Sequence, residues 1–215
     1  MRVSIEAPDI SGFPNGFLAF WSRLLPFHAG PVSRSYHVYA LAGTYVRLIE
    51  VALQEYRLGC LRLREFWDTQ ESFNITAINR SISHFETCVT SMHRAINSYK
   101  RLRHKKDPLS VHLNHEKPAF ATDKIAGHLR ELRRQIHHLD EHLVKGKIEG
   151  GQPFALIADG PERNDPANPG NTLKTLDRLV IGSKELLFTD LVAWLGEMCR
   201  EAQKIAMFIP DSQRQ

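Results

Sequence analysis

The segment ITAINRSISHFETCVTSMHRAINSY, residues 75–99, decides the fold that we expect for this chain. Its apolar residues alternate gaps of three and four positions without a break: Ile75, Ile78, Ile82, Phe85, Val89, Met92, Ile96 and Tyr99. This spacing places them on one narrow stripe of an α-helix. The stripe predicts packing against another helix at a shallow angle, either inside one bundle or across a dimer.

Three further helices are expected around this one. The first covers residues 33–69, where apolar residues again recur three and four apart: Val38, Leu41, Tyr45, Leu48 and Ala52. The next begins at Thr122, a good N-cap residue, and ends near Gly146, a natural C-cap. The last is expected to be capped by Thr189, with one apolar face: Leu191, Leu195, Met198, Ala202 and Ile205.

The composition changes between the third and the last of these helices. Residues 154–158, 176–181 and 185–188 are strand candidates, and Gly182-Ser183 is a tight turn between the last two. Residues 159–171 hold three prolines and two glycines, which predicts a loop. We therefore expect an all-α fold: a four-helix-bundle-like domain at residues 32–209, with a small β-hairpin insertion at about 152–188. Residues 1–31 would form an irregular N-terminal arm and residues 210–215 a tail.

The overall composition is that of an ordinary globular protein. The chain has 215 residues, of which 42% are hydrophobic and 24% charged, and this excludes a mostly disordered chain, a collagen and a disulfide-built mini-protein. Cys60, Cys88 and Cys199 are widely spaced without a CxxC pair, so we expect reduced thiols and a cytoplasmic location. The apolar run at residues 17–27 is too short for a membrane span. We expect it to form a short helix packed on the body, with an interfacial membrane anchor as the alternative.

A basic run follows the second helix. Five of residues 100–106, KRLRHKK, are Lys or Arg, while the net charge of the whole chain is only +4. Cations at a helix C-terminus interact favourably with the helix dipole, which is one interpretation of the run. The other is an electrostatic surface for the phosphates of a nucleic acid. The candidate nucleic-acid-binding residues are Lys100, Arg101, Arg103, Lys105, Lys106 and Arg130. His112 and His115 have a spacing that suits a metal only in a helix, and we expect no helix there.

The stretch RELRRQIHHLDEH, residues 130–142, carries the chemistry of the third helix. The apolar stripe of this helix consists of Ile125, Leu129, Leu132, Ile136, Leu139 and Leu143. Opposite this stripe, a helical projection places Arg130, Arg134, His137, His138 and Glu141. Arginine binds phosphate through its planar guanidinium group, which can contact two oxygens at once, and histidine transfers protons near neutral pH. Arginine and histidine are the smallest set of side chains that can cleave RNA without a metal, because RNA supplies its own 2′-hydroxyl nucleophile. The alternative is an ordinary solvated face, with Arg134 and His138 each beside Glu131 or Glu141.

The segment from Arg133 to His138 resembles the R-x4–6-H motif of the HEPN superfamily of helical domains. The resemblance implies a metal-independent endoribonuclease of a toxin or defence type, in which the Arg and His of two subunits meet in one cleft. Under it, Arg133 or Arg134 stabilises the phosphate, His138 transfers the proton and Glu141 orients a neighbour. RNA, a second copy of the chain and an antitoxin or regulatory protein would be partners, with no cofactor. The family residue after the Arg is commonly Asn, Asp or His, so Arg134 leaves the choice of motif arginine open.

Two other functions are consistent with the same residues. The first is a non-catalytic helical module that binds a partner protein or a nucleotide. The second is a zinc hydrolase, because His138, Glu141 and His142 form the pattern H-x-x-E-H, with Glu197 or Glu201 as a third ligand. Peptidases with this pattern need a far larger fold than 215 residues provide. The zinc hydrolase is therefore the least favoured of the three hypotheses, and we expect no bound metal.

Overall fold

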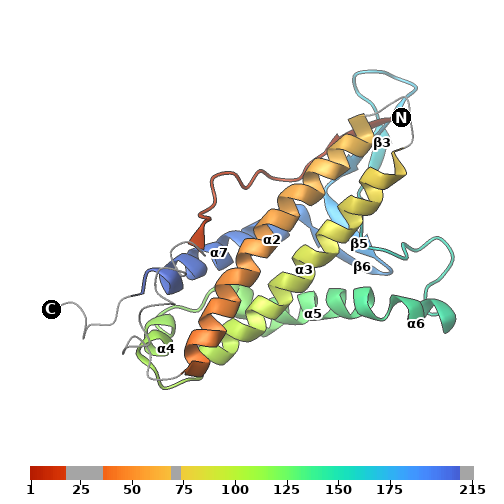
Figure 1. Ribbon diagram of the computed structural model, residues 1–215. Helices are drawn as coiled ribbons and strands as arrows, with labels where there is room; N and C mark the ends of the chain where they lie inside the picture. The colour runs from red at the N-terminus through yellow and green to blue at the C-terminus, as the bar shows by residue number, and fades with distance from the viewer. Residues whose placement is uncertain (18–35, 69–73, 209–215) are drawn as a thin grey trace.

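The computed structural model describes residues 1–17, 36–68 and 74–208. Most of the expected helix at residues 17–27 and the whole of the tail at 210–215 lie outside this part. Helices α2 (Tyr36–Asp68) and α3 (Ile75–Arg103) run side by side as a long antiparallel pair (Figure 1). The apolar stripe of α3 is buried from Phe85 to Tyr99, which confirms the main helical prediction. Ile75, by contrast, is 60% exposed, in the first turn of α3.

Two shorter helices pack against this pair. α5 (Asp123–His137) lies against α3, and α7 (Phe188–Ala206) lies against α2 (Figure 1). The hydroxyl of the buried Tyr45 donates a hydrogen bond of 3.0 Å to the carbonyl of Met198, which joins α2 to α7. Helix α4 (Pro108–Leu113) and a 3-10 turn at Ala119–Ala121 connect α3 to α5. The residue before α7 is Leu187, without a side-chain cap, so the prediction that Thr189 caps this helix is wrong.

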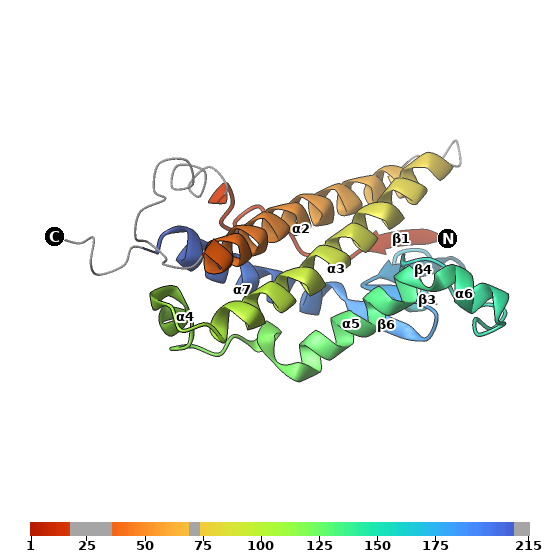
Figure 2. The same cartoon turned by 60° about the horizontal axis from the view of Figure 1, so that its bottom comes forward.

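The expected helix at 122–146 is interrupted. Thr122 caps α5 as predicted, since its hydroxyl accepts from the backbone N–H of Ile125 at 3.5 Å. The helix ends at His137, His138 leaves the helical conformation with φ −112° and ψ 22°, and α6 (Leu139–Val144) follows. Leu129 and Leu132 are buried, whereas α6 buries no residue and projects beyond the body (Figure 2). Without a packing surface, nothing holds the two segments in one continuous helix.

The described residues contain more strand structure than an all-α fold with one hairpin. Strands β1 (Arg2–Ile5), β4 (Thr172–Leu176) and β3 (Glu162–Asn164) form one sheet in that order, and β1 runs parallel to β4. Strands β2 (Ile157–Asp159), β5 (Arg178–Ile181) and β6 (Lys184–Leu187) form the second. The molecule is mostly helical, but the all-α class and the single hairpin are corrected by these six strands.

One element of the predicted insertion is confirmed. The turn at Gly182-Ser183 joins β5 to β6, whose ends pair Ile181 with Lys184. Gly182 has φ +54°, a conformation that glycine adopts without steric cost. Strand β3 occupies part of the predicted loop, and β1 occupies part of the predicted irregular arm. The hairpin packs on α5, so the sheet supports the helix that carries the candidate site.

Candidate functional site

His138 lies at the junction between α5 and α6. Its backbone N–H donates to the carbonyl of Arg134 at 3.0 Å, and its side chain is half exposed. The Nδ1 atom lies 3.3 Å from Oε1 of Glu141, and the other oxygen of Glu141 accepts from Lys145 at 3.2 Å. Hydrogen bonds from Lys145 and then from His138 lower the pKa of Glu141. The structure therefore brings together His138 and an ionised carboxylate that orients its ring.

The two candidate motif arginines differ in their exposure and in their partners. Arg134 is exposed, and its guanidinium group lies 2.7 Å from the carboxylate of Glu131. Arg133 is half-buried, and its Nε atom is buried without a hydrogen-bond partner among the described residues. Within the same part of the chain, neither guanidinium group donates a hydrogen bond to the ring of His138, whose partner is Glu141. In one copy of the chain, Arg134, Arg133 and His138 therefore have separate neighbours: Glu131, His93 and Glu141.

His93, which the sequence patterns did not indicate as a site residue, lies on α3 near Arg133. His93 is only 8% exposed; its Nε2 is 3.3 Å from the side-chain nitrogen of Asn97, and its Nδ1 has no partner within the described residues. Burial lowers the pKa of His93, and the positive charges of Arg133 and Arg130 lower it further. The imidazole of His93 is therefore neutral near pH 7, because it is buried and lies near the positive charges of Arg130 and Arg133. Its position beside the α3 stripe, four residues before Asn97, was the only signal available in the sequence.

The predicted basic run, which continues beyond the end of α3 at Arg103, divides into two sets of side chains with different surroundings. Lys100 forms an ion pair of 2.8 Å with Asp123, at the start of α5. The Nε of Arg103 donates to the side chain of Asn114 at 2.9 Å, and its guanidinium group lies 5.9 Å from the centre of the Tyr99 ring. These two cations hold neighbouring segments in place. Lys106 is exposed.

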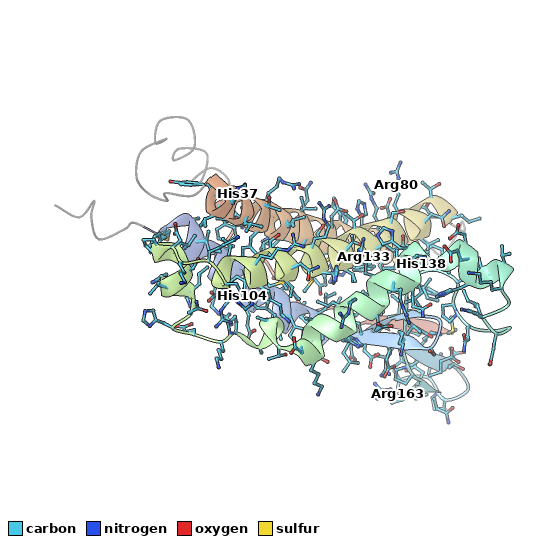
Figure 3. The ribbon with its side chains drawn as sticks, turned by 90° about the horizontal axis from the view of Figure 1, so that it is seen from below. His37, Arg80, His104, Arg133, His138 and Arg163 are labelled. Carbon is cyan, nitrogen blue, oxygen red and sulfur yellow. The ribbon has the colours of Figure 1, made fainter. Side chains whose placement is uncertain are left out.

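The remaining basic side chains line a groove of about 590 Å³ between the start of α2 and the end of α3. Its described lining is His37, Ala40, Leu41, Thr44, Arg101, His104 and Lys105. None of these residues carries a carboxylate, so the side-chain charge of the groove is positive. Figure 3 shows His37 and His104 at this end of the molecule, away from His138. The structure thus gathers part of the predicted phosphate-binding set and separates it from the predicted catalytic set.

A second pocket, of about 640 Å³, lies between α5, β6 and the first turns of α7. It is lined by Thr122, Lys124, Ile125, Gly127, His128, Glu131, Lys184, Asp190 and Trp194. The rings of His128 and Trp194 meet at 79°, with their centres 6.1 Å apart. Glu131 belongs to the wall and is also the partner of Arg134, so the pocket adjoins the predicted motif. The sequence analysis did not identify this pocket, because its residues come from three separate segments.

The residues of the zinc hypothesis do not converge. His142 is 2.8 Å from the side-chain oxygen of Gln135, and Glu197 accepts the backbone N–H of Phe120. Glu201 is buried and accepts the hydroxyl of Tyr99. No group of three or more His, Cys, Asp or Glu side chains in the described part of the chain is arranged to hold a metal ion. Residues 108–113 form helix α4, so the prediction of no helix there is wrong. His112 and His115 still do not form a metal-binding pair on one helix, because His115 lies beyond the end of α4.

The cysteines are unsuited to nucleophilic chemistry. All three are buried and none forms a disulfide. Burial raises the pKa of Cys60 to about 11 and that of Cys199 to about 12, so both thiols stay protonated near neutral pH. The cysteines are therefore not candidates for a nucleophile in this protein.

Comparison with protein-family models, with curated proteins and with solved structures finds no match for this chain. The HEPN resemblance accordingly rests on the segment from Arg133 to His138, which lies in α5 up to His137. Within the described ranges, no helix is both long enough and apolar enough to cross a membrane.

Proposed function

We propose that this protein binds RNA and cleaves it without a metal ion. The observation that carries the proposal is the groove formed by α2 and α3. Its described lining holds Arg101 and Lys105 together with two histidines, and no carboxylate. Positively charged side chains that neutralise phosphates supply most of the sequence-independent affinity for nucleic acid. Arginine adds a planar fork that matches two phosphate oxygens.

Helix α5 runs from the neighbourhood of the basic run to His138. Lys100, within the basic run, contacts Asp123 at the start of α5. His138 directly follows the last residue of α5. A helix of 15 residues is about 22 Å long, so a strand of several nucleotides would extend along α5 from Lys100 to His138. Arg130 lies between the two ends, is exposed, and acts electrostatically on both Asp123 and His93. These charges support a continuous phosphate-binding path along α3 and α5.

His138 is the side chain that we propose for proton transfer. The 2′-oxygen of the RNA forms a bond to phosphorus as the bond from phosphorus to the 5′-oxygen breaks. The proton of the 2′-hydroxyl goes to a general base, and a general acid protonates the 5′-oxygen, leaving a 2′,3′-cyclic phosphate and a 5′-hydroxyl. Glu141 holds the ring of His138 for one of these transfers.

A second copy of the chain would complete the site. In one copy, Arg134 is paired with Glu131 and Arg133 is directed toward α3, so we propose that the partner supplies the arginine and the second histidine. The stripe of α3 is buried inside the fold and does not provide the dimer contact. Leu143 and Val144 of α6 are exposed, the latter by 88%, and they lie close to His138 in the chain. We propose this surface for the homodimer; a toxin or defence role with an antitoxin partner follows from the resemblance.

The test is cleavage of single-stranded RNA in EDTA, with the termini mapped. We expect His138→Ala to lower the rate by about 10²–10⁴-fold, while His115→Ala, an exposed histidine outside the site, keeps the wild-type rate. The double variant Arg101→Ala/Lys105→Ala should weaken RNA binding and flatten its dependence on salt.

The outcomes separate the parts of the proposal. Equal cleavage by the wild type and His138→Ala would contradict the catalytic role. Salt-dependent RNA binding without cleavage would favour the non-catalytic module. That alternative has one observation in its favour, since Arg134 and His138 are both paired with carboxylates of their own segment. An absence of RNA binding would refute the proposal as a whole.

A further inference from the structure

We infer that the pocket between α5, β6 and α7 receives an unpaired nucleobase, stacked on Trp194. The inference rests on the proposed function and narrows its substrate to single-stranded RNA. Trp194 is half-buried and forms part of the pocket wall. His128 packs against it nearly at a right angle, which fixes the two rings relative to each other. An indole held in this way is a platform for a flat aromatic ligand.

The charges around the pocket are suited to a nucleotide and unsuited to a simple anion. Lys124 and Lys184 supply positive charge for the phosphates that flank a base. Glu131 and Asp190 supply carboxylate oxygens, which accept hydrogen bonds from the amino and ring N–H groups of a base. The same carboxylates repel a free phosphate. A ligand with an aromatic plane, N–H donors and adjacent phosphates therefore meets all three kinds of group.

Gly127 lines the pocket and leaves open space beside it. A Cβ atom built at Gly127 would meet only the guanidinium group of Arg130, at 3.8 Å, so nothing in the described structure forbids a side chain there. A larger side chain at this position would occupy the pocket without altering Trp194. Gly127 thus offers an independent way to close the pocket.

The position of the pocket relates it to the proposed cleavage site. Glu131 lines the pocket, and His138 follows seven residues later, about 10 Å along the helix axis. A base in the pocket and a phosphate near His138 would therefore belong to the same short stretch of strand. The base must be unpaired, because a paired base stays within its helical stack and does not reach a side pocket.

The experiment measures binding by fluorescence anisotropy with two labelled probes of equal length and charge. One is a single-stranded RNA, and the other is an abasic strand that keeps the sugar and the phosphates. We expect Trp194→Leu to weaken binding of the RNA by about 10- to 100-fold, the loss of one stacked base. Binding of the abasic strand should not change. Trp194→Phe keeps an aromatic platform and should stay within a few-fold of the wild type.

Two further variants guard against misfolding and non-specific effects. Gly127→Leu should reproduce the selective loss of RNA binding, because it fills the pocket and also favours the helix. Phe154→Leu removes an exposed aromatic side chain elsewhere and should bind both probes like the wild type. Thermal unfolding of each variant verifies that it is folded.

The failures are distinguishable. If Trp194→Leu and Gly127→Leu bind RNA as tightly as the wild type, or lose both probes equally, the base pocket is wrong while the proposed function stands. If the wild type binds neither probe, the proposed function fails and the pocket inference fails with it.

Discussion

The guanidinium group of Arg134 lies 2.7 Å from the carboxylate of Glu131, one helical turn earlier on α5. Its neighbour Arg133 is turned toward α3, where its charge lowers the pKa of His93. Two adjacent arginines of one motif thus have different tasks in the folded chain. Arg134 is an exposed ion-pair partner at the edge of a pocket, whereas Arg133 contributes to the packing between two helices.

This difference predicts unequal costs in stability. Arg134→Ala should change the free energy of unfolding by less than about 0.5 kcal/mol, because exposed ion pairs contribute little. Arg133→Ala should cost about 1 kcal/mol, since its half-buried aliphatic stem would be lost. Arg133→Met keeps that stem and should recover most of the loss. Urea unfolding measures all three, and equal effects of the two alanine variants would contradict the assignment.

The buried His93 should make stability depend on pH. Its pKa is lower in the folded protein than the value of 6.5 expected after unfolding, so the unfolded chain binds more protons between these two values. The free energy of unfolding should therefore decrease as the pH falls below about 6.5 and level off below the folded pKa. His93→Gln should remove this part of the pH dependence.

The comparison is made by urea unfolding of the wild type and His93→Gln at pH 7.5 and 5.5. The groups that face His93 are Arg130 and Arg133 from α5 and Asn97 from α3. Because other groups titrate equally in both proteins, only the difference between the two profiles counts. Parallel profiles would show that His93 is not the titrating group.

Tyr99 and Glu201 form a buried contact between α3 and α7. The hydroxyl of Tyr99 donates to the Glu201 carboxylate at 2.6 Å, and Lys204 contacts the other oxygen at 2.7 Å. Tyr99→Phe should lower the free energy of unfolding by roughly 1.5–3 kcal/mol, the range for a hydrogen bond to a charged group. Glu201→Gln keeps an acceptor for Tyr99 and should cost less. A Tyr99→Phe variant as stable as the wild type in thermal unfolding would refute this role.

Gly59 allows the close approach of α2 and α3. A Cβ atom at this position would lie 2.8 Å from the ring of Phe85, which is almost fully buried. Gly59→Ala should therefore destabilise the protein by about 1–3 kcal/mol through overpacking, even though alanine favours a helix. Gly127→Ala is the matched control and should stabilise α5 by about 0.5–1 kcal/mol. Restoration of stability by adding Phe85→Leu to Gly59→Ala would identify the contact.

Local patterns predicted the helices well and the sheets poorly. The stripe from Phe85 to Tyr99 was recognisable because helical periodicity is a property of a short segment. The pairing of β1 with β4 joins Arg2 to Leu173, and β1 is only four residues long. A strand of this length is stabilised by its distant partner, so its own sequence carries little information about it. The end of α5 at His137 was missed for a related reason, because the predicted stripe continued through Leu139 and Leu143 where no neighbour buries it.

The features of the candidate site also separate into those set by the local sequence and those set by the tertiary structure. The sequence by itself determined which chemical groups α5 carries, namely arginines, histidines and carboxylates at helical spacing, because residue type and period are local. The pairing of Arg134 with Glu131 is also local, three residues apart on one helix. Only the tertiary structure decided the contacts between segments: Arg133 over His93, and Trp194 beside His128 in a pocket built from three segments. Charge and proton affinity depend on burial and on neighbours within a few ångströms, and those neighbours come from distant parts of the chain.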